Sequence, residues 1–402
     1  MAPRTGTPLK FETITTPAEL NELCQRLAAK PIIAFDTEFV SEDRYRPQLC
    51  LIQVAAAEII AVIDPLAVPQ TEPFWELLAT PGRTVVAHAA REEVRFCYHY
   101  AGKPIAGLFD TQLAAGFVGL EYPSSLSNLV ARLLNVKISK GETRTNWRTR
   151  PLSDSQLQYA VRDVTELEAM YALLNKEIRE AGRWEWMAEE SQRFQQNIHH
   201  AENRENWQRV SGASGLPARQ LEIVRQLWRW RDRRARQLDV PVRRVFRDDL
   251  IVEVARAGSA DPKSIRSIRG MEFRNFHDHY DDLAAAVQRA LDMPESELPR
   301  RNRGRHSTTS PMLAQFLNTS IACVCRQHHI APMIVGNTDD IRDMIAYELE
   351  GAHQDELPAL LQGWRGKIVG EPFRQLIQGK LAIKVANPRE HQPLEFVPVS
   401  GD

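Results

Sequence analysis

The sequence has few cysteines, no long apolar run and no excess of charge of either sign. Its 402 residues include 5 cysteines, an odd number that does not suit a disulfide framework. No apolar run approaches the roughly 18 uncharged residues that a membrane span needs. The start of the chain, Met1 to Gly6, lacks the apolar core of a secretory signal. We therefore expect a cytoplasmic protein with reduced thiols and no membrane contact.

The charges nearly cancel, with 51 Lys and Arg against 52 Asp and Glu and a formal net charge of -1. Taken as an average, this balance lacks the strongly basic signature of a nucleic-acid binder, although an average conceals local asymmetry. The hydrophobic fraction of 43% is ordinary for a soluble globular protein. The length exceeds the usual size of one domain, so we expect two or three.

The first half of the sequence alternates between strand and helix patterns. Short apolar runs bounded by polar residues, proline or glycine are typical of buried strands. Their alternation with helical periods predicts an α/β domain whose sheet is buried on both faces. A long helix is expected to follow over 152–182, begun by a capping box of Ser153 and Gln156. The expected strands lie at 31–35, 48–55, 59–63 and 84–87, and the expected shorter helices at 19–29 and 92–100.

The second half of the sequence is predicted to be helical. A polar stretch with several tryptophans runs from Trp184 to Trp207, and Ser211 to Gly215 is the clearest linker. A weak internal repeat, in which Ile268-Arg269-Gly270 is echoed by Trp364-Arg365-Gly366, predicts two related helical modules. The expected divisions are an α/β domain at 1–183, a helical connector and linker at 184–215, helical modules at 216–295 and 308–382, and a tail at 383–402 that is expected to fray from Asn387.

Two pairs of residues indicate chemistry. Asp36 and Glu38 are two apart at the end of an expected strand, so both carboxylates project from one face. Carboxylate oxygens are the ligands that Mg²⁺ prefers. Tyr159 and Asp163 are four apart and lie on one side of the long helix. In a phosphodiesterase, Asp163 can complete a metal site and the tyrosine can orient the attacking water. Taken alone, each pair is also compatible with solvated surface residues.

A series of motifs follows along the chain: Phe35 to Val40, Leu51-Ile52-Gln53, Ile63-Asp64-Pro65, His88-Ala89, Phe109 to Gln112, Lys140 to Trp147, and Arg150-Pro151-Leu152 with Tyr159, Ala160 and Asp163. In this order, over roughly 9–380, the series resembles bacterial ribonuclease D, a DEDD-type exonuclease of the tyrosine subclass. The resemblance implies an RNase H-like core, with a mixed sheet flanked by helices, followed by two all-α HRDC-like domains.

The resemblance also implies an activity, a cofactor and partners. The chain would be a metal-dependent 3′-5′ exoribonuclease that uses two divalent ions, Mg²⁺ or Mn²⁺. By position, Asp36, Glu38 and Asp163 would be metal ligands and Tyr159 would orient the water. The expected partner is RNA with a single-stranded 3′ extension, with tRNA precursors as the family's implied substrates, and the expected enzyme is a monomer.

One position departs from the family pattern. The helical metal-ligand Asp of the second motif falls on Glu93, whose extra methylene displaces the carboxylate. We interpret Glu93 as a catalytic metal ligand whose extra length is taken up by the backbone, and Asp110 as a supporting residue. The substitution leaves open an RNA-binding protein with an impaired nuclease site. A 3′-5′ DNA exonuclease is a further alternative, since the DEDD domains that the motifs resemble include DNA-proofreading ones and HRDC domains also occur in DNA helicases.

Several residues are candidates for substrate contact. Lys140 and Arg144 lie in the basic loop before the catalytic helix and can neutralise phosphates. Phe39, Gln53 and His88 lie close to the metal-bearing strand in the family pattern, and each also has a structural interpretation. An arginine-rich segment at 225–247 contains Trp228 and Trp230. Interleaved arginine and aromatic residues favour single-stranded or structured RNA, but a solvated helix face has the same pattern.

Overall fold

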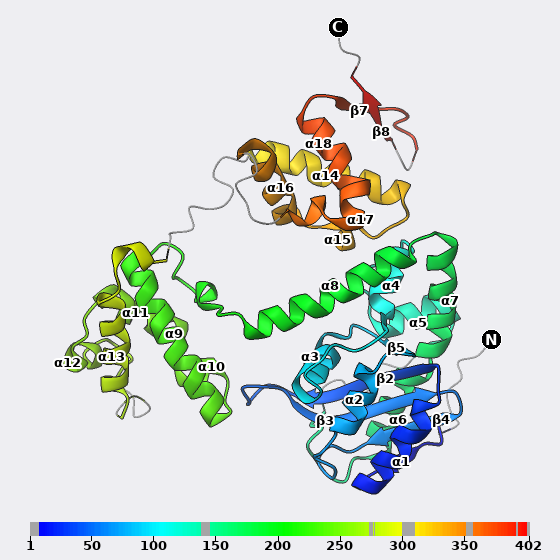
Figure 1. Cartoon of the computed structure of the whole chain (residues 1–402), viewed down its shortest axis with the longest axis horizontal. Coiled ribbons are helices and arrows are strands. Elements are labelled where there is room, and N and C mark those ends of the chain that lie inside the picture. Colours follow the sequence, from blue (N-terminus) through cyan, green and yellow to red (C-terminus); the bar gives the residue numbers. More distant parts are fainter. Residues whose placement is uncertain are drawn as a thin grey trace. The chain divides into compact units, whose positions relative to one another are not determined.

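The computed structural model describes residues 8–137, 145–272, 276, 278–299, 310–350, 357–390 and 393–399 (Figure 1). Their contacts divide the chain into two compact units. The first unit, here called the exonuclease unit after the family that its motifs resemble, comprises Met1–Glu38, Cys50–His199 and Gly304–Asp402. The second, here the helical unit, comprises Phe39–Leu49 and His200–Arg303. None of the described helices combines the length and apolarity needed to cross a membrane.

The exonuclease unit is built on a six-stranded mixed sheet in the order β1-β4-β3-β2-β5-β6. Strand β4 runs parallel to β1 and antiparallel to β3, and β5 runs parallel to both β2 and β6. All four predicted strands are confirmed, and β2 and β3 extend further than their apolar cores. The strands are β1 Glu12–Ile14, β2 Ile32–Val40, β3 Gln48–Ala56, β4 Ile59–Ile63, β5 Thr84–Ala87 and β6 Leu108–Asp110.

Helices pack around this sheet, and one of them differs from prediction. The capping box of Ser153 and Gln156 begins α6 as expected. The single long helix predicted over 152–182 is wrong, because the chain leaves helical hydrogen bonding at Glu166 and forms two helices. The helices are α1 Pro17–Ala28, α2 Glu72–Ala79, α3 Arg91–Tyr100, α4 Thr111–Phe117, α5 Leu126–Leu134, α6 Asp154–Thr165, α7 Leu167–Glu180 and α8 Trp184–Asn203.

The helical unit has its own core, formed by residues within 207–291. Residues 211–215, predicted to be a linker, contribute to it, because Ala213 is 1% exposed and the flanking Val210 and Leu216 are also buried. The compact units instead divide at His199. The elements are η1 Trp207–Arg209, α9 Ala218–Leu238, α10 Val242–Val245, α11 Asp248–Ala257, α12 Pro262–Arg266, α13 Tyr280–Leu291 and η3 Glu295–Glu297.

The second helical module belongs to the exonuclease unit. Trp364 stacks on Trp186 of α8 with ring centroids 5.5 Å apart, and the Ala331 N–H donates to the Gly116 carbonyl of α4. The prediction that the tail frays from Asn387 is wrong for Leu394–Pro398, because β8 pairs antiparallel with β7. The elements are α14 Pro311–Gln327, α15 Pro332–Val335, α16 Thr338–Glu350, η4 Ala359–Leu361, α17 Gly363–Arg365, η5 Gly366–Gly370, α18 Glu371–Ile377, β7 Leu381–Val385 and β8 Leu394–Pro398.

Candidate active site

Three predicted metal ligands meet where β2 approaches α6. Asp36 and Glu38 project from the same face of β2, and Asp163 comes from the last turn of α6. One carboxylate oxygen of each lies within 4.8 Å of those of the other two. The fold therefore brings Asp163 close to two carboxylates that precede it by more than 120 positions in the sequence.

The electrostatics of this trio are those of crowded, desolvated carboxylates. Burial, followed by the charges of Asp163 and Glu93, raises the pKa of Glu38 to about 8. Burial and three neighbouring carboxylates, with Glu93 the strongest, raise the pKa of Asp36 well above its usual value. Burial likewise raises the pKa of Asp163 to about 6, although a hydrogen bond from Tyr159 opposes the increase. The carboxylates thus disfavour one another's charged forms unless a cation is bound among them.

Tyr159 lies one helical turn before Asp163 on α6, and its hydroxyl donates to the Asp163 carboxylate. Its ring lies against Trp147, with centroids 6.2 Å apart and planes inclined by 31°. Trp147 is 4% exposed, so its indole packs in the interior and supports the Tyr159 ring. The structure therefore places the predicted water-orienting hydroxyl at the edge of the carboxylate trio.

Glu93 is close to the trio but does not belong to it. Its Oε1 accepts a hydrogen bond of 2.6 Å from the Thr37 hydroxyl, which lies between the two ligands of β2. Burial raises the pKa of Glu93 to about 7, although the Thr37 hydrogen bond opposes the increase. The charge of Glu93 still acts on Asp36 and Glu38. Metal ligation by Glu93 stays a prediction, and in this structure its carboxylate is held by Thr37.

The predicted substrate residues near β2 differ in exposure. Phe39 directly follows Glu38 and is partly exposed. Gln53 is fully buried in β3, and neither atom of its amide has a partner among the described residues. His88 uses Nδ1 with the Thr111 hydroxyl at 2.9 Å and Nε2 with the Ser124 carbonyl at 3.0 Å. The two hydrogen bonds favour a structural role for His88, whereas the buried amide of Gln53 has no such explanation, and the contacts of both residues with substrate stay predictions.

The predicted basic surfaces are only partly described. Lys140 and Arg144 lie outside the described residues. On α9, Trp230 is buried against Phe246, so it packs in the helical core and does not present a stacking platform. Arg233 is exposed and forms no ion pair within the described part of the chain. Five arginines of the basic segment are each paired with a carboxylate, namely Arg225, Arg229, Arg231, Arg236 and Arg247.

Asp110 supports the site as predicted. Its carboxylate accepts from the backbone N–H groups of Ala89 and Ala90 at 3.0 and 2.9 Å, and from that of Gln112 at 2.8 Å. It thereby holds the turn that leads into α3, the helix of Glu93, and caps α4.

Sequence reasoning missed two side-chain contacts, the hydrogen bond from the Thr37 hydroxyl to Glu93 and the pairing of the Arg150 guanidinium with Asp64. Thr37 and Arg150 both lie inside the quoted motifs, but neither residue type by itself announces a hydrogen-bond partner distant in sequence.

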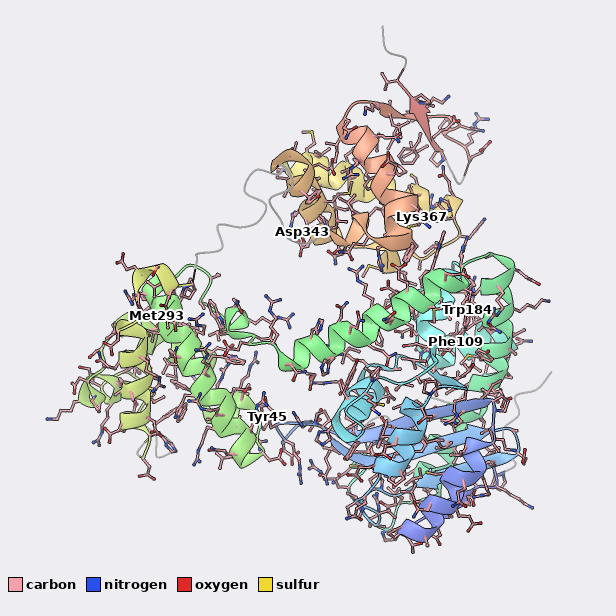
Figure 2. The ribbon with its side chains drawn as sticks, viewed as in Figure 1. Tyr45, Phe109, Trp184, Met293, Asp343 and Lys367 are labelled. Carbon is pink, nitrogen blue, oxygen red and sulfur yellow. The ribbon has the colours of Figure 1, made fainter. Side chains whose placement is uncertain are left out.

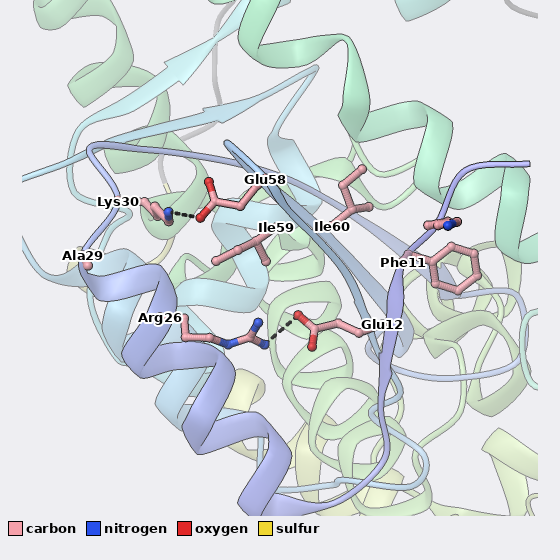
Figure 3. Close-up of a pocket in the computed structure, with 9 residues that line it drawn as sticks. Phe11, Glu12, Arg26, Ala29, Lys30, Glu58, Ile59 and Ile60 are labelled. Carbon is pink, nitrogen blue, oxygen red and sulfur yellow. Dashed lines mark hydrogen bonds and ion pairs between the residues drawn. The ribbon is translucent and has the colours of Figure 1, made fainter.

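A separate cavity of about 580 Å³ lies beside α1, β1 and β4 (Figure 3). Four of its charged side chains are paired, Arg26 with Glu12 and Lys30 with Glu58, both at 2.6 Å, and Lys10 also lines it. None of the three clustered carboxylates lines it. The cavity therefore lacks the metal-binding chemistry of the candidate site.

Comparison with known proteins places this geometry in a family. Residues 11–179 match the family model for a 3′-5′ exonuclease, and residues 220–287 match the HRDC domain. Ribonuclease D of Gluconacetobacter diazotrophicus is 34% identical over 94% of this chain and 95% of its own length. Ribonuclease D of Zymomonas mobilis is 33% identical over 92% and 95%. The crystal structure of Escherichia coli RNase D, an exoribonuclease involved in structured RNA processing, has a TM-score of 0.83, 29% identity, and coverage of 92% of this chain and 99% of that one.

Proposed function

Because this chain belongs to the ribonuclease D family and is a 3′-5′ exoribonuclease, we propose that it trims the 3′ ends of structured RNA by hydrolysis that depends on two divalent ions. The proposed substrates are RNAs with a single-stranded 3′ extension, tRNA precursors among them. The relative from Escherichia coli, which acts in structured RNA processing, supports this substrate class. A monomeric, cytoplasmic enzyme with Mg²⁺ or Mn²⁺ completes the proposal.

The observation that carries the proposal is the cluster of Asp36, Glu38 and Asp163, with one oxygen of each within 4.8 Å of the others. The donor set fits divalent cations, because all three ligands are carboxylates and hard cations bind oxygen ligands. Burial and the charges of neighbouring carboxylates raise the pKa values of Asp36 and Glu38, and burial raises that of Asp163, so negative charge is disfavoured at this site. Bound divalent cations would stabilise that charge.

The chain's own residues divide the work of hydrolysis. Asp36, Glu38 and Asp163 would hold the ions, and Glu93 would join them if it left Thr37. The bound ions supply positive charge that stabilises the charge developing on the phosphate and the leaving 3′ oxygen. Burial and the charges of Asp163 and Glu38 raise the pKa of Tyr159, so its hydroxyl stays protonated and can orient the attacking water.

RNA contacts remain a proposal at the level of residues. Arg233 is exposed on α9, within the part of the chain that matches the HRDC domain, and is available for a phosphate. We propose for Lys140 and Arg144 their predicted contacts with phosphates, and for Phe39 its predicted contact with the terminal nucleotide. Because several neighbouring arginines are paired internally, we expect Arg233 to contribute more to RNA affinity than Arg225 or Arg229.

The proposal is tested by incubating the purified protein with 3′-extended RNA or DNA of the same sequence, with Mg²⁺, Mn²⁺ or EDTA. We expect stepwise shortening of the RNA that requires metal. Asp36→Asn should lower the rate by about 100-fold or more, since loss of one charge-stabilising group costs on that order. Asp339→Asn, an exposed aspartate of the second helical module, is the matched control and should retain activity. Faster degradation of DNA than of RNA would make the substrate assignment wrong.

A second candidate is an RNA-binding protein with an impaired nuclease site. The observation that favours it is the hydrogen bond from Thr37 to Glu93, which holds that carboxylate outside the trio. Glu93→Asp separates the two candidates, because Asp is the family's residue at this position. Wild-type inactivity that Glu93→Asp restores would favour the impaired site, and an active wild type would exclude it.

A further inference from the structure

Arg150 lies in the segment before α6, and each N–H of its guanidinium has an acceptor. A guanidinium carries five N–H donors. Nε and Nη2 donate to the two carboxylate oxygens of Asp64, at 2.6 and 2.8 Å. Nη2 also donates to the Cys50 carbonyl at 2.7 Å, and Nη1 donates to the Trp147 and Thr149 carbonyls at 2.7 and 2.9 Å. One side chain thereby ties β3 and the end of β4 to the chain that leads into α6.

Asp64, which accepts both hydrogen bonds of the bidentate pair, is itself held by backbone hydrogen bonds. The backbone N–H of Asp64 donates to the Ile14 carbonyl of β1 at 3.0 Å, and the carboxylate accepts from the Leu66 N–H at 2.9 Å. Partial burial opposes ionisation of Asp64, but hydrogen bonds from Arg150 and Leu66 outweigh it and lower the pKa. A lysine has three donors on a single nitrogen, so it cannot reproduce this fork.

Trp147, one of the residues whose carbonyl accepts from Arg150, contacts Tyr159. The Trp147 backbone carbonyl is one of the Arg150 acceptors, and its indole lies against the Tyr159 ring at 6.2 Å. The amide of Gln156 on α6 also donates to the Thr145 hydroxyl at 2.9 Å, so the same segment is joined to the first turn of the helix. The segment whose main-chain carbonyls accept from Arg150 is therefore also the segment that contacts Tyr159 and the first turn of α6.

We propose that Arg150 is a positioning residue for Tyr159, acting through Trp147. This inference rests on the proposed function, in which Tyr159 orients the attacking water. Loss of the fork lets residues 147–150 move, and a displaced tyrosine hydroxyl lowers the rate of the chemical step. Binding of RNA does not depend on this hydroxyl, so the Michaelis constant is unaffected.

The test is a double-mutant cycle in the full-length protein. The variants are Arg150→Lys, Tyr159→Phe and the combination, assayed for kcat and KM on one 3′-extended RNA with Mg²⁺. We expect Arg150→Lys to lower kcat by about 10- to 100-fold, the order expected of a misplaced catalytic group. KM should change by less than about 2-fold. In the Tyr159→Phe background, Arg150→Lys should lower kcat by no more than about 2-fold, because its effect passes through the tyrosine.

Two further variants distinguish a change in the position of Tyr159 from a general loss of folding. Asp64→Asn removes the charged acceptor while leaving the three carbonyl acceptors of Arg150, and it should show a smaller decrease in kcat that also disappears in the Tyr159→Phe background. Arg26→Lys alters an exposed arginine–carboxylate pair on α1 and should leave kcat unchanged. RNA affinity in EDTA, measured by fluorescence anisotropy, should be the same for all variants within about 2-fold.

The outcomes are distinct. If Arg150→Lys and Tyr159→Phe each lower kcat and their effects multiply, Arg150 acts by another route and the inference is overturned while the role of Tyr159 stands. The inference is also overturned if both Arg150→Lys and Asp64→Asn leave kcat unchanged or change only KM. If Tyr159→Phe alone keeps full kcat, the proposed role of Tyr159 fails and the role of Arg150 fails with it.

Discussion

In the first helical module, the buried side chains of α9, α11 and α13 form a hydrophobic cluster drawn from residues 207–291. In the second module, buried side chains of α14, α16 and η5 belong to a cluster that also contains Phe109, Phe117 and Met187 of the exonuclease core. Phe109 is itself stacked on Trp184, the first residue of α8 (Figure 2). Modules with similar sequence patterns thus bury their apolar faces differently, one within itself and one against the exonuclease core.

The buried ion pairs of the two modules follow the same division. Arg231 of α9 pairs with Asp248 and donates to the Phe246 carbonyl, all within the helical unit. Arg365 of α17 pairs with Glu190 of α8 and donates to carbonyls of its own module. Both arginines are less than 10% exposed. A buried arginine fixes a helical element in each case, but only in the second module does it join that element to the exonuclease core.

The largest expected effect comes from removing the aromatic contact that joins the second module to the core. Trp364 is 1% exposed, stacks on Trp186 and meets the edge of Phe117. We expect Trp364→Ala to destabilise the exonuclease unit by about 3 kcal/mol, the lower end for a buried tryptophan. The lower end applies because its indole N–H has no partner among the described residues. Hydrogen exchange of the full chain should show faster opening of α4 and α8.

The matched variant is Trp230→Ala in the first module. Trp230 is 7% exposed and packs on Phe246, so its loss should accelerate exchange in α9 and α11 and leave the exonuclease sheet protected. The comparison between the modules breaks down if Trp364→Ala affects only the second module, or if Trp230→Ala weakens protection of β5.

A smaller effect concerns acid stability. Partial burial opposes ionisation of Asp248, but hydrogen bonds from Arg231 and the Ser211 N–H outweigh it and lower the pKa. Because the folded pKa lies below the unfolded value of about 3.9, this contribution is fully present above that value and is lost as pH falls through the folded pKa. The helical unit of the wild type should therefore lose stability below about pH 4 more steeply than that of Asp248→Asn.

The measurement is hydrogen exchange of α9 and α11 at several pH values between about 3 and 6, corrected for intrinsic exchange. The difference between wild type and Asp248→Asn isolates this carboxylate from other acidic groups. A difference that is constant across this range would contradict the assignment, and Asp339→Asn, with its exposed carboxylate, provides the control for nonspecific charge effects.

Local sequence patterns predicted much of the fold. Apolar runs identified the central strands, and Ser153 with Gln156 marked the start of α6, because each signal depends on neighbouring residues. Periodicity placed Asp36 and Glu38 on one face of a strand and Tyr159 and Asp163 on one side of a helix, but the resemblance to ribonuclease D indicated that these faces meet. The break at Glu166 escaped prediction because the apolar stripe continues across it, so periodicity gives no sign that one helix ends and another begins there.

Long-range pairing escaped prediction for a different reason. Nothing local to Thr37 indicates Glu93 as its partner, and the five donors of Arg150 reach acceptors on β3, β4 and its own segment. The Gly and Ser residues of 211–215 suggested a linker, yet the intervening Ala213 is buried because the surrounding helices close over it. Tertiary packing determines each of these outcomes.

The smallest expected change in stability comes from substitutions at and beside Tyr45, which belongs to the helical unit. Its hydroxyl donates to Asp232 of α9 at 2.8 Å, and the Arg236 guanidinium lies 5.2 Å from its ring centroid. Burial and then the Asp232 hydrogen bond raise the pKa of Tyr45 to about 12, so the hydroxyl donates at neutral pH. Tyr45→Phe keeps the ring, removes this bond and should destabilise the helical unit by about 0.5–1.5 kcal/mol.

Arg44→Gln removes an exposed ion pair with Asp239, and it should destabilise the helical unit by about 0–1 kcal/mol. Exchange of α9 measures the effects of both variants, and accelerated exchange in α4 instead would contradict the assignment of residues 39–49 to the helical unit.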